Sequence, residues 1–292
     1  MDSLLDFTEK TALITGAASG FGEALALALA TRGAKLCLAD FNAEGLADTV
    51  KQVEALGGEV VSLVGDIADE AHNEALVLLA KERFGRLDIA VNNAGVAPRL
   101  GPMTQLDGPT LDRQLAVNAK GVAFGMKHQM RAMGAQKNGA ILNVSSMAGL
   151  GGTPMGSSYC AAKHALEAIT ESLYFELQNE NIDAVIFQAS PMLMERSTPG
   201  GSPRAVKNLT PGSLTIKAVE KVRSSNLTSK LTPEAVAEKV YEVVSSTSKP
   251  LRTRIGLTKI IHIMTRIVPR FVINKIVEKE FSDNALKKFK HS

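Results

Sequence analysis

A serine, a tyrosine and a lysine stand close together in the middle of the chain, at a spacing that suits acid–base chemistry. Ser146 precedes Tyr159 by thirteen residues, and Lys163 follows Tyr159 by four. If Tyr159 opens a helix, Tyr159 and Lys163 lie one turn apart on the same face. A free phenol has a pKa of about 10, and a nearby cation favours its ionised form. A phenol tuned in this way could take a proton from an alcohol or return one to a carbonyl, while Ser146 hydrogen-bonds the same oxygen.

A glycine-rich turn near the amino terminus predicts a dinucleotide site. An apolar run over residues 11–15 leads directly into the sequence GAASGFG, which begins at Gly16 and ends at Gly22. An Ala- and Leu-rich helix is expected next, over residues 23–31. In a strand–turn–helix unit, glycines let backbone N–H groups approach a pyrophosphate at the helix N-terminus.

The second apolar run, over residues 35–39, ends at an acidic residue, Asp40. A carboxylate at this point can hydrogen-bond the adenosine ribose hydroxyls and would repel a 2′-phosphate. Phe41 follows, where an NADP site would be better served by arginine. The alternative is that Asp40 is an ordinary polar residue at a strand end. These residues favour NAD over NADP as the cofactor.

Strand and helix patterns then alternate with short connections as far as residue 187. Further strands are expected over residues 60–64, 89–92, 140–144 and 184–187, and helices over 43–56, 70–84, 110–133 and 159–178. Such alternation predicts an α/β fold, a doubly wound parallel sheet with helices on both faces. Ligands bind at the carboxyl edge of such a sheet. The residues expected at that edge are Gly16, Asp40, Asp66, Asn93 and Ser146.

With these motifs placed, the chain resembles the short-chain dehydrogenase/reductase family over roughly residues 8–190. The matching motifs are Thr15-Gly16-x-x-x-Gly20-x-Gly22, Asn92-Asn93-Ala94-Gly95, Asn118, Ser146 and Tyr159-x-x-x-Lys163. The resemblance implies a single Rossmann-like domain with a seven-stranded parallel sheet. It also implies a homodimer or homotetramer.

The resemblance implies a role for each motif residue. Tyr159 would be the general acid/base, and Lys163 would lower its pKa and hold the nicotinamide ribose. Ser146 would orient the substrate oxygen, and Asn118 would anchor a water that links Lys163 to solvent. The implied cofactor-binding residues are Gly16, Ser19, Gly20, Phe21, Gly22, Asp40, Asp66, Ile67, Asn93, Ala94, Gly95, Tyr159, Lys163 and Pro191.

The sequence departs from the family pattern after Pro191. Met192 stands where the family usually has glycine, and Arg196 stands where it has a threonine that contacts the nicotinamide carboxamide. Residues 197–230 are rich in Ser, Thr, Pro and Gly, and we expect them to cover the substrate. The loops expected to border the cleft carry Met147, Met155, Met192 and Met194.

Methionine suits adaptable apolar binding surfaces, although ordinary loop packing is the alternative. We therefore expect a hydrophobic substrate, such as a steroid, retinoid, terpenoid or lipid-like compound. The reaction that the site residues and the resemblance predict for it interconverts a secondary alcohol and a ketone or aldehyde. The alternatives are an NADP-dependent carbonyl reductase and a non-catalytic regulator that senses NAD(H).

Composition excludes several other classes of protein. No apolar run reaches the roughly 18 residues of a membrane span, and the acidic N-terminus is not a secretory signal. Cys37 and Cys160 show no metal-ligand spacing, which favours no metal and a reducing compartment, the cytoplasm. Sparse aromatic residues, 4%, argue against nucleic-acid binding.

The carboxyl-terminal segment differs in charge from the rest of the chain. Residues 251–292 hold ten Lys/Arg and three Asp/Glu. We expect a catalytic domain over residues 1–250, with a helix from 233 to about 245. A last strand, 251–255, and a basic amphipathic helix would form an extension over 251–292. Such a helix can lie on an anionic membrane. We favour the alternative, in which its apolar face covers the cleft or a neighbouring subunit.

Overall fold

The computed structural model describes residues 7–99, 101–177, 179–189, 233–246 and 249–255, together with single residues and pairs between 258 and 275. Within this part of the chain the strands, helices and side chains can be placed. Pro191, Met192, Met194, Arg196 and the segment expected to cover the substrate, 197–230, lie outside the described residues.

Seven parallel strands form one sheet in the order β3-β2-β1-β4-β5-β6-β7. The strands are β1 (Thr11–Thr15), β2 (Lys35–Asp40), β3 (Val60–Val64), β4 (Ile89–Asn92), β5 (Gly139–Ser146), β6 (Ile182–Ala189) and β7 (Arg252–Arg254). The expected seven-stranded parallel sheet is confirmed. The strand order reverses between β1 and β4, which is where open α/β sheets bind ligands.

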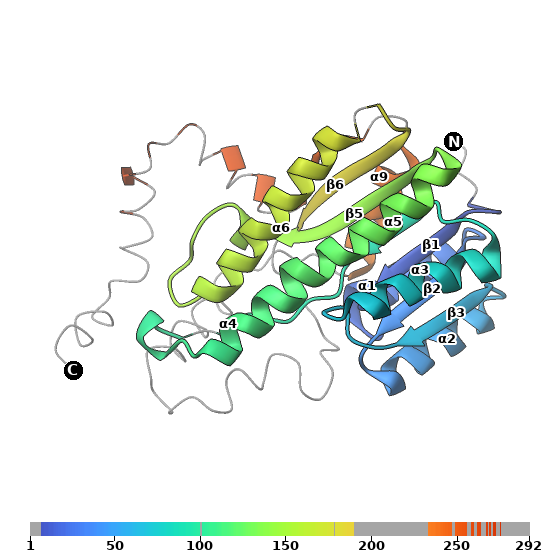
Figure 1. Cartoon of the computed structure of the whole chain (residues 1–292), viewed down its shortest axis with the longest axis horizontal. Helices are drawn as coiled ribbons and strands as arrows, with labels where there is room; N and C mark the ends of the chain where they lie inside the picture. Colours follow the sequence, from blue (N-terminus) through green and yellow to red (C-terminus); the bar gives the residue numbers. More distant parts are fainter. Residues whose placement is uncertain are drawn as a thin grey trace.

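Helices cover both faces of the sheet (Figure 1). One apolar core lies under α1 (Gly20–Ala30), α2 (Ala43–Ala55) and α9 (Pro233–Ser245). The other lies under α3 (Glu70–Phe84), α5 (Val122–Gln136) and α6 (Ser157–Glu176). The central strands β1, β4 and β5 are almost continuously buried, as expected for strands covered on both sides.

The long helix expected over 110–133 is divided in the structure. It consists of α4 (Gly108–Leu115), a π-helical segment (Ala116–Gly121) and α5. Gly121 packs closely on the loop that follows β3. A Cβ on residue 121 would stand 2.5 Å from the Ile67 carbonyl oxygen. A local π-helical turn is common at functional sites, and here it carries Asn118.

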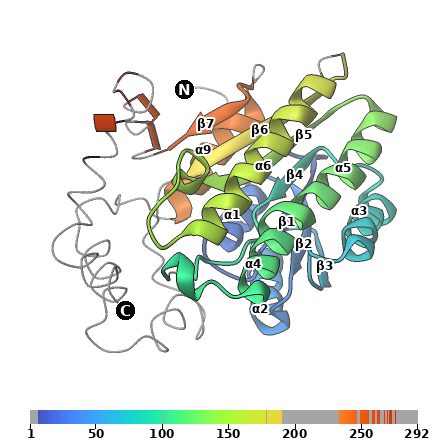
Figure 2. The same cartoon turned by 60° about the vertical axis from the view of Figure 1, so that its left-hand side comes forward.

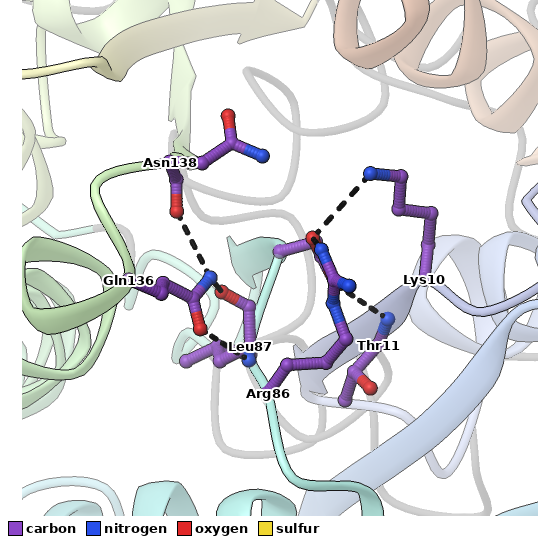
Figure 3. Close-up of polar contacts among 7 residues, drawn as sticks. Lys10, Thr11, Arg86, Leu87, Gln136 and Asn138 are labelled. Carbon is purple, nitrogen blue, oxygen red and sulfur yellow. Dashed lines mark hydrogen bonds and ion pairs between the residues drawn. The ribbon is translucent and has the colours of Figure 1, made fainter.

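Polar contacts hold the amino-terminal edge of the sheet, and Figure 3 shows them around Lys10, Thr11, Arg86, Leu87 and Gln136. Asp88 accepts hydrogen bonds from the Thr11 backbone N–H at 3.0 Å and from two guanidinium nitrogens of Arg86 at 2.6 and 2.7 Å. Gln136 bonds both backbone groups of Leu87 from α5. These contacts fix the starts of β1 and β4, so the carboxyl ends of the same strands are held in register at the opposite edge.

The start of the predicted extension belongs to the body of the fold. β7 pairs with β6, and buried Thr258 donates from Oγ1 to the Gln188 carbonyl oxygen at 3.0 Å. Further along, the side chains of Ile263, Ile267 and Phe271 are exposed. Among the described residues there is no helix long and apolar enough to cross a membrane.

Candidate active site

All five residues expected at the carboxyl edge of the sheet lie at or just beyond the ends of strands. Figure 2 shows these strands running side by side in the sheet. Asp40 ends β2 and Ser146 ends β5. Gly16 directly follows β1, and Asn93 directly follows β4. Asp66 lies two residues beyond the end of β3. The carboxyl edge therefore carries one glycine turn, two carboxylates, an amide and a hydroxyl, on both sides of the point where the strand order reverses.

The glycine turn between β1 and α1 leaves no room for larger residues. Gly16 and Gly20 adopt positive φ angles of 70° and 59°. A Cβ on Gly22 would stand 2.0 Å from the Gly16 carbonyl oxygen. Ser19 occupies the N-cap position of α1, and its hydroxyl makes no cap hydrogen bond, which leaves it available to a ligand. Phe21 is buried and stacks on Phe187, so only its backbone could contact a nucleotide.

Thr15 is a site residue that the sequence reasoning treated only as part of a motif. Its Oγ1 accepts hydrogen bonds from the backbone N–H groups of Asn93 and Ala94, each at 3.1 Å. The Asn93 side chain returns hydrogen bonds to the carbonyl oxygens of Thr15 and Gly16, at 2.9 and 3.1 Å. These four bonds fasten the glycine turn to the end of β4. A buried threonine at the end of a strand, next to a glycine turn, is the only signal for this role in the sequence.

Replacing Thr15 by Val is expected to destabilise the protein by about 1 kcal/mol, because it removes the acceptor of the part-buried Ala94 N–H and one of the two acceptors of the Asn93 N–H at nearly constant side-chain volume. Urea unfolding followed by circular dichroism measures the loss. Thr31→Val is the matched control, since the Thr31 hydroxyl is exposed and bonds only the Ala28 carbonyl of its own helix. Equal stabilities of the two variants would contradict the role of Thr15.

Asp40 is held by the backbone around the glycine turn. Its two carboxylate oxygens accept from the N–H groups of Ala18 and Asn42, at 3.0 and 2.9 Å. Each oxygen keeps a further lone pair, so the carboxylate can still accept from hydroxyl groups. Phe41, beside it, is 74% exposed.

Asp66 and Ile67 border the same edge from the loop after β3. Asp66 accepts from the Arg113 guanidinium at 2.5 Å and from the Ala68 N–H at 3.0 Å. Partial burial raises the pKa of Asp66, but the hydrogen bonds and the charge of Arg113 outweigh it and hold this pKa below its usual value. The carbonyl of buried Ile67 accepts from the Asn73 side chain at 2.7 Å. Arg113 on α4 is a second residue that sequence reasoning missed.

Ser146, Tyr159 and Lys163 come from β5 and α6. α6 begins at Ser157, so Tyr159 lies in its first turn, as expected, with Lys163 one turn later. The Lys163 ammonium donates to the Val144 carbonyl oxygen at 2.9 Å and lies 5.8 Å from the centre of the Tyr159 ring. The Ser146 hydroxyl accepts from the Ala148 N–H at 3.3 Å and donates its own proton toward the Tyr159 phenol.

The pKa of the Tyr159 phenol is shifted upward, whereas the sequence led us to expect a downward shift caused by Lys163. Burial raises this pKa above its usual value and outweighs the hydrogen bond with Ser146, which lowers it. Burial also lowers the pKa of Lys163 to about 8, with the charge of Glu167 opposing the shift. The two shifts therefore favour the protonated phenol of Tyr159 and make the Lys163 ammonium easier to deprotonate than that of a free lysine.

Asn118 is fully buried, and its side chain is engaged in the protein. Its Oδ1 accepts from the Val96 N–H, and its Nδ2 donates to the Val96 carbonyl, both at 3.0 Å. Nδ2 also donates to Gln114 at 2.6 Å. A Cβ on Gly95 would stand 2.7 Å from the Asn118 amide oxygen. The Asn118 amide thus holds the loop that follows Asn93-Ala94-Gly95.

The described part of the chain shows no group of three or more His, Cys, Asp or Glu side chains that could hold a metal ion. What it does show is a dinucleotide-type turn next to a serine, a tyrosine and a lysine, at the carboxyl edge of a doubly wound sheet.

Comparison with known proteins agrees with this arrangement. A family model described as short chain dehydrogenase matches residues 10–198. Levodione reductase from Leifsonia aquatica is 38% identical over 168 residues, which are 57% of this chain and 63% of that protein. Cis-4-hydroxycyclohexanecarboxylate dehydrogenase from Sinomonas cyclohexanicum is 38% identical over 194 residues, 66% of this chain and 74% of that one.

A solved structure shows the same fold over almost the whole chain. A short-chain dehydrogenase/reductase from Burkholderia phymatum, in complex with NAD, has a TM-score of 0.76 and 29% identity, and the match covers 90% of this chain and 96% of that one. The chain belongs to the short-chain dehydrogenase/reductase family of NAD(P)-binding Rossmann-fold oxidoreductases. In sequence it spans less than two thirds of the length of levodione reductase.

Proposed function

We propose that the protein is an NAD-dependent oxidoreductase that interconverts a secondary alcohol and a ketone. The observation that carries this proposal is the convergence of Ser146, Tyr159 and Lys163 beside the glycine turn between β1 and α1. An acid–base group and a dinucleotide-type turn at one sheet edge suit hydride transfer coupled to proton transfer.

The residues of the turn fit a dinucleotide. Gly16 and Gly22 have no side chain that would keep a ligand away from the backbone of the turn. The first turn of α1 offers N–H groups without helical partners, and the Ser19 hydroxyl makes no cap hydrogen bond. Asp40 would accept from ribose hydroxyls, and Asp66, Ile67, Asn93, Ala94 and Gly95 would line the adenosine half. The nicotinamide ring, when bound, supplies the hydride acceptor or donor.

The chain's own residues manage the proton. During alcohol oxidation Tyr159 would take the hydroxyl proton, and during reduction it would return one to the carbonyl oxygen. Ser146 would donate a hydrogen bond to the same oxygen, because accepting from the Ala148 N–H does not use the hydroxyl proton. Lys163 would favour the phenolate by its charge and bind the ribose hydroxyls. Buried Asn118 would position the loop that follows β4 and anchor the water that links Lys163 to solvent.

We propose NAD rather than NADP because Asp40 would repel a 2′-phosphate. Replacing Asp40 by Ser is expected to shift the ratio of NADPH to NADH affinity by about a hundredfold in favour of NADPH, since a charge repulsion and two ribose hydrogen bonds are lost together. Nucleotide fluorescence titration measures both affinities. Asp48→Ser on α2 is the control with the same charge change on an exposed side chain. An unchanged ratio in Asp40→Ser would remove Asp40 from the cofactor assignment.

We propose an apolar, ring-shaped substrate. The name of cis-4-hydroxycyclohexanecarboxylate dehydrogenase gives a six-membered-ring substrate for one relative. Met147 and Met155 lie in the loop between β5 and α6, which joins Ser146 to the helix that carries Tyr159. Methionine suits apolar surfaces of variable shape. Steroid and terpenoid alcohols share this ring chemistry.

The other functions that the sequence left open make different predictions. An NADP-dependent carbonyl reductase would bind NADPH more tightly than NADH. A non-catalytic sensor would bind NADH and turn over no substrate. A panel of cyclic alcohols and ketones, each assayed with NAD(H) and NADP(H) by absorbance of the reduced nicotinamide, separates the three. Turnover with NAD(H) is the expected result, and turnover with NADP(H) alone would contradict the proposal.

We further propose a cytoplasmic homodimer or homotetramer. Cys37 and Cys160 are buried free thiols, which suits a reducing compartment. The exposed apolar residues Ile263, Ile267 and Phe271 would pack on a neighbouring subunit.

A further inference from the structure

A buried carboxylate with no assigned role lies one helical turn beyond Lys163. Glu167 on α6 is 6% exposed. Its Oε1 accepts from the Ser145 hydroxyl at 2.8 Å and from the Gln188 amide at 2.7 Å, and its Oε2 lies 3.4 Å from Nε of Arg252. Three strands, β5, β6 and β7, therefore converge on one carboxylate beneath the active-site turn.

The turn after Ser146 packs directly on this carboxylate. A Cβ on Gly149 would stand 2.4 Å from Oε1 of Glu167 and 2.8 Å from the Ser145 hydroxyl. Any change in the position of Glu167 is therefore passed to the segment that begins with Ser146. The contact explains why a glycine is needed at position 149, where φ is not unusual.

Charge gives Glu167 a second effect. Lys163 is 5% exposed, and its one hydrogen bond among the described residues goes to an uncharged carbonyl, that of Val144. An ammonium so buried is stabilised mainly by nearby negative charge. Glu167, at i+4 on the same helix, is the acidic side chain that raises the pKa of Lys163.

The other ionisable groups around Lys163 are engaged elsewhere or exposed. On α4 and the π-helical segment, Asp112 and Lys120 are exposed and Arg113 is paired with Asp66. On α5, Lys127 and His128 face Glu70 of α3. On β6, Asp183 is paired with Lys249. In addition, α6 itself carries Tyr159, Cys160, His164, Glu171, Tyr174 and Glu176, and β7 carries Arg252 and Arg254.

We propose that Glu167 is a positioning residue that keeps Lys163 charged and fixes the Ser145–Gly149 turn, and that Arg252 opposes this effect on the lysine by neutralising part of the carboxylate charge. The catalytic consequence rests on the proposed function, because it assumes that charged Lys163 serves Tyr159. The effect on the charge of Lys163 does not depend on any activity.

The two residues are predicted to move the titration of Lys163 in opposite directions. Glu167→Gln preserves side-chain size and removes the negative charge, so Lys163 should lose its proton about one pH unit lower than in the wild type. Arg252→Gln leaves Glu167 with its Ser145 and Gln188 partners and removes a positive charge, so the midpoint should rise by about half a pH unit. A residue that only supports the fold would not give shifts of opposite sign.

The measurement is an NMR titration of the full-length protein labelled with ¹³C at lysine Cε, with the Lys163 signal assigned by its loss in Lys163→Met. The wild-type midpoint is expected near the Lys163 pKa of about 8. Glu171→Gln is the matched control, because Glu171 also contacts Arg252, at 3.3 Å, from a half-exposed position one turn further along α6. Its midpoint should stay close to that of the wild type.

Equal midpoints in Glu167→Gln and wild type would overturn the proposal, as would shifts of the same sign in the Glu167 and Arg252 variants. If Glu167→Gln does not fold, Arg252→Gln decides alone: an upward shift supports the proposal, and an unchanged midpoint contradicts it. Because no substrate or nucleotide is present, failure of this proposal is distinguishable from absence of dehydrogenase activity.

Discussion

Replacing Tyr159 by Phe is expected to lower turnover with NAD(H) by about a thousandfold while leaving NADH affinity within about tenfold of the wild type. The substitution removes the group that would carry the proton, and such a group contributes about 10²–10⁴-fold to rate. The cofactor contacts expected around the glycine turn are untouched, and the loss of one neutral hydrogen bond to the ribose is worth about 1 kcal/mol. Steady-state rates and a fluorescence titration on the same preparation measure both quantities.

Tyr174→Phe is the control, because Tyr174 lies on the same helix, outside the site. Its turnover should stay close to that of the wild type. Turnover of Tyr159→Phe close to that of the control would contradict the acid–base assignment. Loss of NADH binding together with turnover would point instead to a structural role for the phenol.

Replacing Lys163 by Met is expected to abolish most turnover and yet make the protein more stable at neutral pH. Burial lowers the pKa of Lys163 from 10.5 to about 8, so holding the ammonium charged inside the protein costs stability. The difference of roughly 2.5 units corresponds to about 3 kcal/mol. Methionine fills a similar volume without a charge, so the variant should unfold at a higher urea concentration.

The sign of the pH dependence follows from the same shift. Below the folded pKa of about 8 the lysine is charged in both states, and the cost of burying it is fully present. Between about 8 and 10.5 the unfolded chain binds more protons than the folded one, so wild-type stability rises with pH and the advantage of Lys163→Met shrinks. Lys51→Met, at an exposed position on α2, is the control, and its stability should stay close to that of the wild type. A Lys163→Met variant that is less stable than wild type at pH 7 would contradict this account.

Much of the fold could be predicted from local sequence patterns, because each strand–helix unit carries its own signal. The apolar run over 11–15, the glycine turn and the Ala- and Leu-rich helix lie within twenty residues of one another, and the structure reproduces them closely. The parallel order then follows from short connections. The close approach of Gly121 to the Ile67 carbonyl, in the segment that divides the 110–133 helix, was not predictable, because it joins distant parts of the chain.

The site shows the same contrast between local and distant contacts. Tyr159 and Lys163 lie on one helix, so their proximity follows from spacing alone. Thr15, Arg113 and Glu167 act through partners 21 to 85 residues away, and no spacing rule connects them. The direction of the Tyr159 pKa was also beyond sequence reasoning, because the spacing shows the nearby cation but not the burial that opposes it.

The proposal that the protein oxidises secondary alcohols with NAD is tested most directly by mixing the wild-type protein with NAD and cyclohexanol that carries deuterium on its alcohol carbon. Hydride transfer predicts formation of cyclohexanone, a rise in reduced-nicotinamide absorbance and one deuterium in each reduced cofactor. Reduced cofactor without deuterium would contradict direct transfer between substrate and nicotinamide. Tight NAD binding with no reaction on any cyclic alcohol or ketone of the panel would contradict the enzyme and favour the sensor.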